Sequence, residues 1–198
     1  MTPDDAHLRE RGLTQEIVFK GNLLRIRLDT VALPNGAIAN REIVDHPGAV
    51  AVLALTDAGE VLLVRQFRYA IGALSLELPA GCLDVPGEPV SAAAARELRE
   101  ETGLAAARWT YLGRFHSSPG FATETTHLLV AEGLTEVGAE PGAEEFLELE
   151  RVPLAEALAM LRRGEIRDSK TMVGLLWYQQ FGLATEQTPP VASTVTED

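Results

Sequence analysis

Positive charge and cysteine are both scarce in this chain. Its 198 residues include 17 Lys or Arg against 29 Asp or Glu, a formal net charge of −12. A surface of that sign repels a phosphate backbone, which argues against non-specific nucleic-acid binding. The single cysteine, Cys82, has no partner for an internal disulfide. That is compatible with a reducing compartment.

Long apolar runs are missing too. No stretch approaches the roughly 20 residues that a membrane helix needs, and the N-terminus carries no secretory signal, so we expect a cytoplasmic protein with no membrane partner. With 46% hydrophobic residues, the chain can still form one sizeable core. No internal repeat is visible.

The chain does have a dense acidic segment. Glu88 is followed by seven residues and then by the run Arg96-Glu97-Leu98-Arg99-Glu100-Glu101-Thr102-Gly103-Leu104. Residues 89–102 are predicted to be helical, because a Pro-Val-Ser start precedes a run of strong helix formers and Gly103 suits the C-cap. The preceding segments Leu78-Pro79-Ala80-Gly81 and Pro86-Gly87 are typical of turns.

On such a helix Glu97, Glu100 and Glu101 share one face. Like charges at this spacing repel by roughly 0.2–0.5 kcal/mol per pair, and a bound cation would remove that repulsion. Clustered hard oxygen ligands suit Mg²⁺ or Mn²⁺ better than zinc. An ordinary salt-bridged surface helix is the competing interpretation, and the wider pattern makes it the less favoured one.

The segment resembles the signature box of the Nudix hydrolases. That box reads Gly, five residues, Glu, seven residues, then Arg-Glu-aliphatic-any-Glu-Glu-any-Gly-aliphatic. This chain matches every position from Glu88 to Leu104, but six residues separate Gly81 from Glu88. We interpret the extra residue as an insertion in loop 82–87 that leaves the helix register intact.

Weaker features are similar to the ADP-ribose pyrophosphatase branch of that family. The resemblance covers roughly residues 15 to 182 and rests on segments 64–69, 77–81, 118–121, 163–166 and 168–171. It implies hydrolysis of ADP-ribose, a small nucleoside diphosphate, to AMP and ribose 5-phosphate.

The resemblance also assigns roles in the site. Two or more Mg²⁺ or Mn²⁺ ions would bind the carboxylates of Glu97 and Glu101 and the carbonyl of Ala80, and Glu100 is a further candidate ligand. The bound metal would lower the pKa of a water ligand. We expect Arg96 to pair with Glu88 or a helix carboxylate and so hold the metal ligands in place. The general base is expected in a distal acidic loop, where the choice between Glu144 and Glu145 stays open.

Substrate contacts are predicted at Arg68, Gly81, Pro119 and Gly120. A guanidinium can bind a phosphate or ribose as a fork, although Arg68 could equally be a surface strand residue. Glu144 and Glu145 could be exposed loop residues with no role. Aromatic side chains could stack an adenine, yet those in strands are more often part of the core; the candidates are Phe19, Phe67, Tyr69 and Phe121.

The alternation of strands with few helices predicts an α/β protein, an α/β/α sandwich with a mixed sheet, which is also the Nudix fold. We expect a flexible N-terminus at 1–14, a small antiparallel sheet at 15–46, the catalytic domain at 47–182 and a disordered tail at 183–198. Segments 49–55 and 61–67 are predicted to form a buried strand pair, and helices are expected at 154–163 and 171–181. By analogy, the N-terminal sheet would exchange across a homodimer.

Other functions stay open at this point. The second candidate is hydrolysis of another nucleoside diphosphate sugar such as GDP-mannose. A non-catalytic ADP-ribose sensor is disfavoured, because the carboxylates from Glu88 to Glu101 are all present and we expect no room for a second domain. Hydrolysis of oxidised nucleoside triphosphates is disfavoured by Pro119 and by the N-terminal extension.

Overall fold

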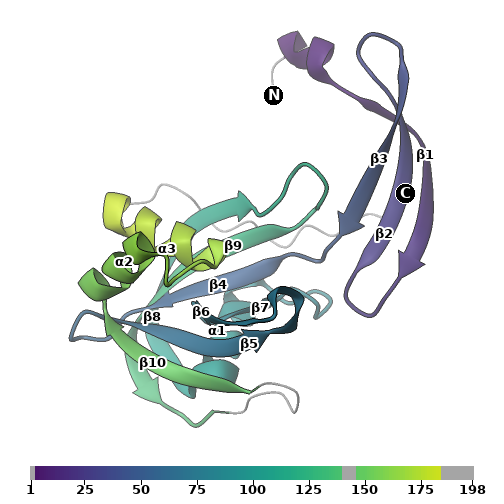
Figure 1. The fold of residues 1–198 in the computed structure, drawn as a ribbon. Helices are drawn as coiled ribbons and strands as arrows, with labels where there is room; N and C mark the ends of the chain where they lie inside the picture. Colours follow the sequence, from purple (N-terminus) through teal and green to yellow (C-terminus); the bar gives the residue numbers. More distant parts are fainter. Residues whose placement is uncertain (1–2, 140–145, 184–198) are drawn as a thin grey trace. The chain divides into compact units, whose positions relative to one another are not determined.

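The computed structural model describes residues 3–139 and 146–183. The chain divides into two compact units, Met1–Pro47 with His116–Glu124 and Gly48–Phe115 with Thr125–Asp198. Figure 1 follows the chain through both units.

The first unit contains the expected antiparallel sheet. A 3₁₀ helix, η1 (Pro3–Leu8), precedes β1 (Arg11–Lys20), β2 (Arg25–Ala32) and β3 (Ile38–Asp45), which pair in the order β1-β2-β3. The first hairpin is closed by the Gly21 N–H, which donates to the Leu24 carbonyl at 2.8 Å. The sheet starts earlier than its expected boundary at residue 15, because β1 already begins at Arg11.

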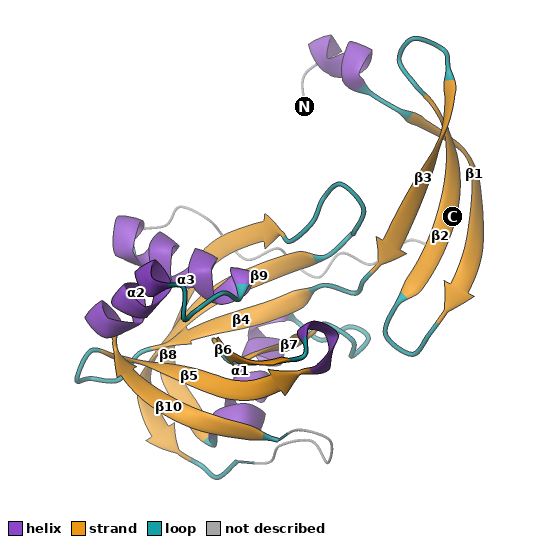
Figure 2. Ribbon diagram, viewed as in Figure 1, coloured by secondary structure: helices purple, strands orange, loops and turns teal. Residues whose placement is uncertain are grey.

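The second unit contains two sheets (Figure 2). The mixed sheet has the order β7-β4-β9-β8, in which β4 runs parallel to β9 and antiparallel to β7. The antiparallel sheet has the order β10-β5-β6. The strands are β4 (Ala49–Ala54), β5 (Glu60–Arg68), β6 (Ala73–Glu77), β7 (Ala80–Cys82), β8 (Leu104–His116), β9 (Thr125–Glu136) and β10 (Leu147–Pro153).

The predicted pairing of β4 with β5 was wrong. Their connecting turn is tight, since the Gly59 N–H donates to the Thr56 carbonyl at 2.9 Å, and one bridge joins Leu55 to Val61. Beyond that bridge the strands enter different sheets. One edge of β4 pairs with β9 along its length, and the other pairs with β7 at Ala49–Ala51. β5 pairs instead with β10 and with β6, a strand that the sequence did not predict.

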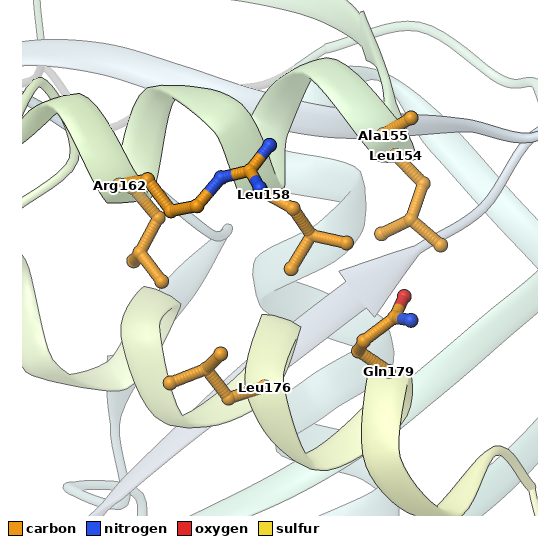
Figure 3. A pocket seen from close by; sticks show the side chains of 7 residues that line it. Leu154, Ala155, Leu158, Arg162, Leu176 and Gln179 are labelled. Carbon is orange, nitrogen blue, oxygen red and sulfur yellow. The ribbon is translucent and has the colours of Figure 1, made fainter.

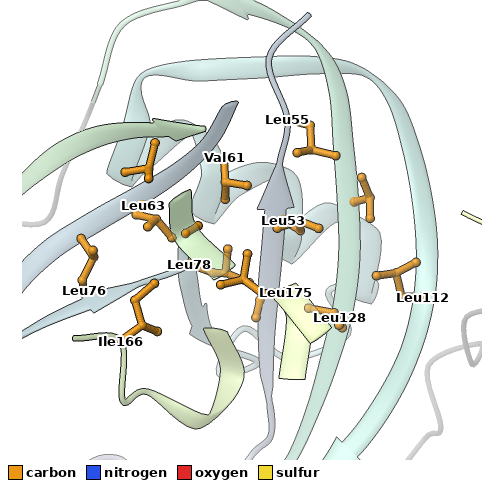
Figure 4. Close-up of a cluster of buried hydrophobic side chains, with 14 residues drawn as sticks. Leu53, Leu55, Val61, Leu63, Leu76, Leu78, Leu112, Leu128, Ile166 and Leu175 are labelled. Carbon is orange, nitrogen blue, oxygen red and sulfur yellow. The ribbon is translucent and has the colours of Figure 1, made fainter. Parts of the chain in front are cut away.

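Helices cover both faces of β4. Its residues alternate, as a strand with two apolar faces requires: Val50 and Val52 pack in the cluster that contains Leu98 of α1 (Val90–Thr102), whereas Leu53 packs in the cluster that contains Leu175 of α3 (Ser169–Phe181). Figure 4 shows this second cluster, with Leu53 and Leu175 among its leucines. The predicted α/β/α layering is confirmed.

The last two helices leave an apolar pocket between them (Figure 3). α2 (Leu154–Arg163) and α3 enclose about 640 Å³, lined by Leu154, Ala155, Leu158, Leu161, Arg162, Leu176 and Gln179. None of the predicted site residues that the structure describes lines it. Within the described ranges, no helix is long and apolar enough to cross a membrane.

Candidate active site

Helix α1 forms where the sequence predicted it. It begins after Pro89 and ends at Gly103, which adopts a left-handed φ of 71° as the C-cap. Two of its carboxylates point inward: Glu97 is 7% exposed and Glu101 is 6% exposed, whereas the Glu100 side chain is 35% exposed. Burial of two acids on one helix is costly unless they have partners, so their surroundings decide what the helix can do.

Arg96 provides part of that partnership. Its Nε and Nη2 atoms donate to the two carboxylate oxygens of Glu88 at 3.1 and 3.0 Å. Its Nη1 donates to Glu97 at 2.6 Å and to Glu100 at 3.1 Å. The hydrogen bond to Glu88, against the opposing effect of burial, raises the pKa of Arg96 above its usual value. The expected pairing is confirmed, and it joins the loop residue Glu88 to helix α1.

The loop before the helix lies directly against its carboxylates. The Ala80 N–H donates to Glu101 Oε2 at 3.0 Å. A Cβ atom added to Gly81 would lie only 2.0 Å from the carboxyl carbon of Glu97, so no side chain fits there. The expectation that Leu78 to Gly81 is only a turn was wrong in its second half, because Ala80–Cys82 forms β7 and satisfies the backbone groups on one edge of β4.

This donor set fits a hard divalent cation. Three carboxylates, those of Glu88, Glu97 and Glu100, pair with the guanidinium of Arg96. The carboxylate of Glu101 accepts from the Ala80 N–H, so acidic groups outnumber this arginine beside the loop. Carboxylate and carbonyl oxygens are the ligands that Mg²⁺ and Mn²⁺ prefer. Among the described residues, no three His, Cys, Asp or Glu side chains converge as a preformed metal site.

A buried ion-pair network lies at the other end of the same loop. Glu77 is 2% exposed, and its carboxylate accepts from Arg68 Nε at 2.8 Å, from Arg68 Nη2 at 2.7 Å and from Lys170 Nζ at 3.4 Å. Burial alone would raise the pKa of Glu77, but the Arg68 hydrogen bonds and the Lys170 charge outweigh it and lower the pKa to about 2. The fork of Arg68 predicted for substrate therefore engages Glu77 in this structure.

The start of α3 completes this network. Asp168 caps the helix by accepting from the Thr171 N–H at 2.9 Å and from the Thr171 hydroxyl at 2.7 Å. The Thr171 oxygen in turn accepts from the Leu78 N–H at 2.8 Å. Sequence reasoning gave none of these residues a role. Two signals were available: an Asp placed three residues before a Thr at a helix start, and the charged Glu77 between Leu76 and Leu78.

The remaining predicted residues lie elsewhere or are not described. Pro119 and Gly120 lie in the first unit, in the turn after β8 that the Phe121 N–H closes on the Ser118 carbonyl at 3.1 Å. Glu144 and Glu145 lie outside the described residues. The four candidate aromatics lie outside the core, since all are more than half exposed: Phe19, Phe67, Tyr69 and Phe121.

The segment that follows β9 and leads toward Glu144 is bonded to the C-terminal end of α1. The N–H groups of Val137 and Gly138 donate to the Gly103 carbonyl at 2.8 and 3.1 Å. A Cβ atom on Gly103 would lie 2.7 Å from the Ala139 nitrogen, so the glycine also permits this close approach. Gly103 thus ends helix α1 and also binds the segment that follows β9.

Known proteins resemble this chain along most of its length. The NUDIX domain model matches residues 45–173. An ADP-ribose pyrophosphatase of Bacillus subtilis is 41% identical over 174 residues, 87% of this chain and 94% of the relative. A Mycobacterium tuberculosis protein of the same name is 42% identical, covering 83% and 80%. A methanol dehydrogenase activator of Bacillus methanolicus is 41% identical, covering 86% and 92%.

A solved structure has the same fold. The crystal structure of an ADP compounds hydrolase aligns with a TM-score of 0.77 at 24% identity, covering 87% of this chain and 93% of that one. The domain match and the curated relatives agree with the motif from Glu88 to Leu104. The chain belongs to the Nudix hydrolase family.

Proposed function

We propose that this protein hydrolyses the pyrophosphate bond of ADP-ribose and releases AMP and ribose 5-phosphate. The observation that carries the chemistry is the contact of a backbone loop, Ala80-Gly81, with two buried carboxylates of one helix, Glu97 and Glu101. The substrate is supported by relatives that are 41% and 42% identical and are named ADP-ribose pyrophosphatase.

Nudix hydrolases generally depend on a divalent metal. We assign two or more Mg²⁺ or Mn²⁺ ions to the carboxylates of Glu97, Glu100 and Glu101 and to the Ala80 carbonyl. When bound, such ions offset the diphosphate charge and lower the pKa of a water ligand. Arg96 orients two of these carboxylates through its hydrogen bonds, and Gly81 leaves room for Glu97 beside the loop.

Glu144 or Glu145 is the proposed general base. The segment that precedes them is anchored by Val137 and Gly138 at the Gly103 carbonyl, two residues beyond Glu101. A base within hydrogen-bond reach of the attacking water would accept its proton.

Arg68, Gly81, Pro119 and Gly120 are proposed to contact the substrate. The Arg68 side chain is 43% exposed beside its pair with Glu77, so it can offer charge to a phosphate or ribose from there. Its positive charge is also needed because the protein as a whole is acidic.

A substrate panel tests the proposal. ADP-ribose, ADP-glucose, GDP-mannose, NADH and diadenosine polyphosphates would be incubated with Mg²⁺ and the products separated by chromatography. We expect the highest kcat/KM for ADP-ribose, with AMP and ribose 5-phosphate as products. A preference for GDP-mannose would reassign the substrate, and binding of ADP-ribose without turnover would identify a sensor.

Variants of the acidic residues test the site. Glu97→Gln and Glu101→Gln are each expected to lower kcat by roughly 100-fold or more with the fold retained, because a charged ligand is lost and the helix tolerates glutamine. Glu148→Gln, whose side chain is 75% exposed on β10, is the matched control and should leave kcat unchanged.

Of Glu144→Gln and Glu145→Gln, one should lower kcat far more than it changes KM. Wild-type rates in all four site variants would place the chemistry elsewhere.

A further inference from the structure

The segment Glu77–Gly81 is fixed residue by residue from several elements. Glu77 pairs with Arg68 and Lys170, and the Pro79 carbonyl accepts from the Val52 N–H at 2.9 Å. At its far end, Ala80 and Gly81 lie against Glu101 and Glu97 of α1. A short segment that is held at both ends and packed in between has little freedom to absorb a displacement of one residue, so a shift at Leu78 is expected to move its neighbours.

Leu78 is the point where α3 holds this segment. The residue is fully buried, and its N–H donates to the Thr171 hydroxyl at 2.8 Å. Its side chain lies so close to α3 that a Cβ atom on Gly174 would be 2.7 Å from Leu78 Cδ1. Thr171 and Gly174 are three residues apart and share one helix face, so a single turn of α3 contacts both the backbone and the side chain of Leu78.

The Thr171 hydroxyl is itself fixed in direction. It is fully buried and donates its hydrogen to Asp168 Oδ2 at 2.7 Å, which leaves an oxygen lone pair for the Leu78 N–H. Asp168 also accepts from Lys170 Nζ at 2.7 Å. Lys170 and Thr171 therefore both donate to Asp168, and the Leu78 N–H donates to Thr171, so each hydrogen bond in this chain has a defined direction.

We propose that Thr171 is a positioning residue for the catalytic centre. Its hydroxyl fixes the Leu78 amide and, through Pro79, sets Ala80 and Gly81 against the carboxylates of Glu101 and Glu97. The proposal rests on the proposed function for its kinetic consequences, whereas its effect on metal binding is independent of the substrate.

Thr171→Val tests this role. Valine matches threonine in shape but leaves the buried Leu78 N–H without an acceptor, so the segment is expected to shift toward another one. We expect Mn²⁺ binding to the substrate-free protein, measured by titration calorimetry, to weaken about tenfold. The kcat for ADP-ribose at saturating Mg²⁺ should fall about tenfold, with KM changed by less than about twofold. Thr171→Ser restores the hydroxyl and should recover both quantities.

Thr126→Val is the matched control. Thr126 is also fully buried in the second unit, but its hydroxyl has no hydrogen-bond partner in the described part of the chain. The same change of side chain there should leave Mn²⁺ affinity and kcat at wild-type values. Thr171→Cys, which keeps a weak sulfur acceptor, replaces Thr171→Val if that variant does not fold, and the same two losses are then expected in smaller degree.

Several results would overturn the proposal. A Thr171→Val or Thr171→Cys protein with a lower Tm but wild-type Mn²⁺ affinity and kcat would reduce Thr171 to a structural role. A Thr171→Ser protein as impaired as Thr171→Val would have the same meaning, because the hydroxyl would then not be the active feature. A wild-type protein that binds Mn²⁺ but leaves ADP-ribose intact would refute the proposed function alone, and the Mn²⁺ comparison would still decide the role of Thr171.

Discussion

A side chain at position 81 would overlap the carboxylate of Glu97, so only glycine fits there. A Cβ atom at Gly81 would lie within 2.3 Å of the carboxyl carbon and both oxygens of Glu97. Gly81 has an ordinary φ, so the requirement for glycine comes from the side chain opposite and not from the backbone. The proposed metal site therefore depends on the absence of a side chain at Gly81 as much as on the carboxylates themselves.

Gly81→Ala should displace the Glu97 carboxylate and lower kcat by roughly 100-fold, with a loss of about 1–3 kcal/mol in unfolding free energy from overpacking. Steady-state kinetics and urea unfolding would measure both effects. Gly12→Ala is the control, because a Cβ atom added to Gly12 would meet no other atom within 4 Å and the site should tolerate the change. Full activity in Gly81→Ala would mean that Glu97 can act from another position.

At the scale of residues, the sequence predicted which residues form the helix and its local pairs better than it predicted contacts between distant residues. The spacing from Glu88 to Gly103 predicted the helix, its C-cap and the pairing of Arg96, because these depend on neighbours a few residues apart. It did not predict that Thr171 bonds to Leu78, since the two are separated by 93 residues. Nothing in local periodicity carries that information, so only the folded chain brings the start of α3 to the loop.

At the scale of elements, Glu77 joins β6 to β5 and α3. Its pKa of about 2 lies below the ordinary value of 4.5. The ionised carboxylate therefore stabilises the folded protein above about pH 4.5, and this contribution is lost as the pH falls toward 2. The same network fixes one end of the segment that ends at Ala80 and Gly81.

Glu77→Gln should lower the unfolding free energy at neutral pH by on the order of 2 kcal/mol, allowing for solvent around Arg68. The difference from wild type should shrink below about pH 4.5, because Glu77 in the unfolded wild-type chain then takes up a proton, which favours unfolding. Urea unfolding between about pH 7 and pH 3 would follow this convergence. A difference that stays constant with pH would show that charge on Glu77 is not the stabilising feature.

The element pattern was also predictable only in part. The apolar patterns located β4, β5 and the three α-helices of the described chain within a few residues. The pairing of β4 with β7 and β9 was not predictable from those signals, because adjacency in a sheet depends on which edges remain open. A hairpin-like turn at Thr56–Gly59 suggested a strand pair, but in the structure a single bridge, Leu55 to Val61, joins the two strands.

At the scale of the whole molecule, we propose that the protein is a homodimer. β1 is an edge strand of the first unit and exposes three consecutive large apolar side chains, Ile17 (57%), Val18 (55%) and Phe19 (55%). Exposed apolar edge strands tend to be covered by a partner. The covering surface in this proposal is a second copy of the chain.

Light scattering coupled to gel filtration should give about twice the chain mass of 21.4 kDa. Phe19→Asp should shift the protein toward the monomer at low micromolar concentration, because a charge would be buried in the interface. Leu74→Asp, at an equally exposed apolar side chain of β6, is the control and should leave the mass unchanged. A monomeric wild-type protein would exclude the dimer.

The Gly103 carbonyl fixes the point at which the chain after β9 leaves helix α1. It receives Val137 and Gly138 at the C-terminal end of the box helix, so whatever chain follows Ala139 starts from a fixed point beside the acidic face. A change of length in the chain beyond Ala139 would therefore leave the C-cap of α1 and its carboxylates where they are.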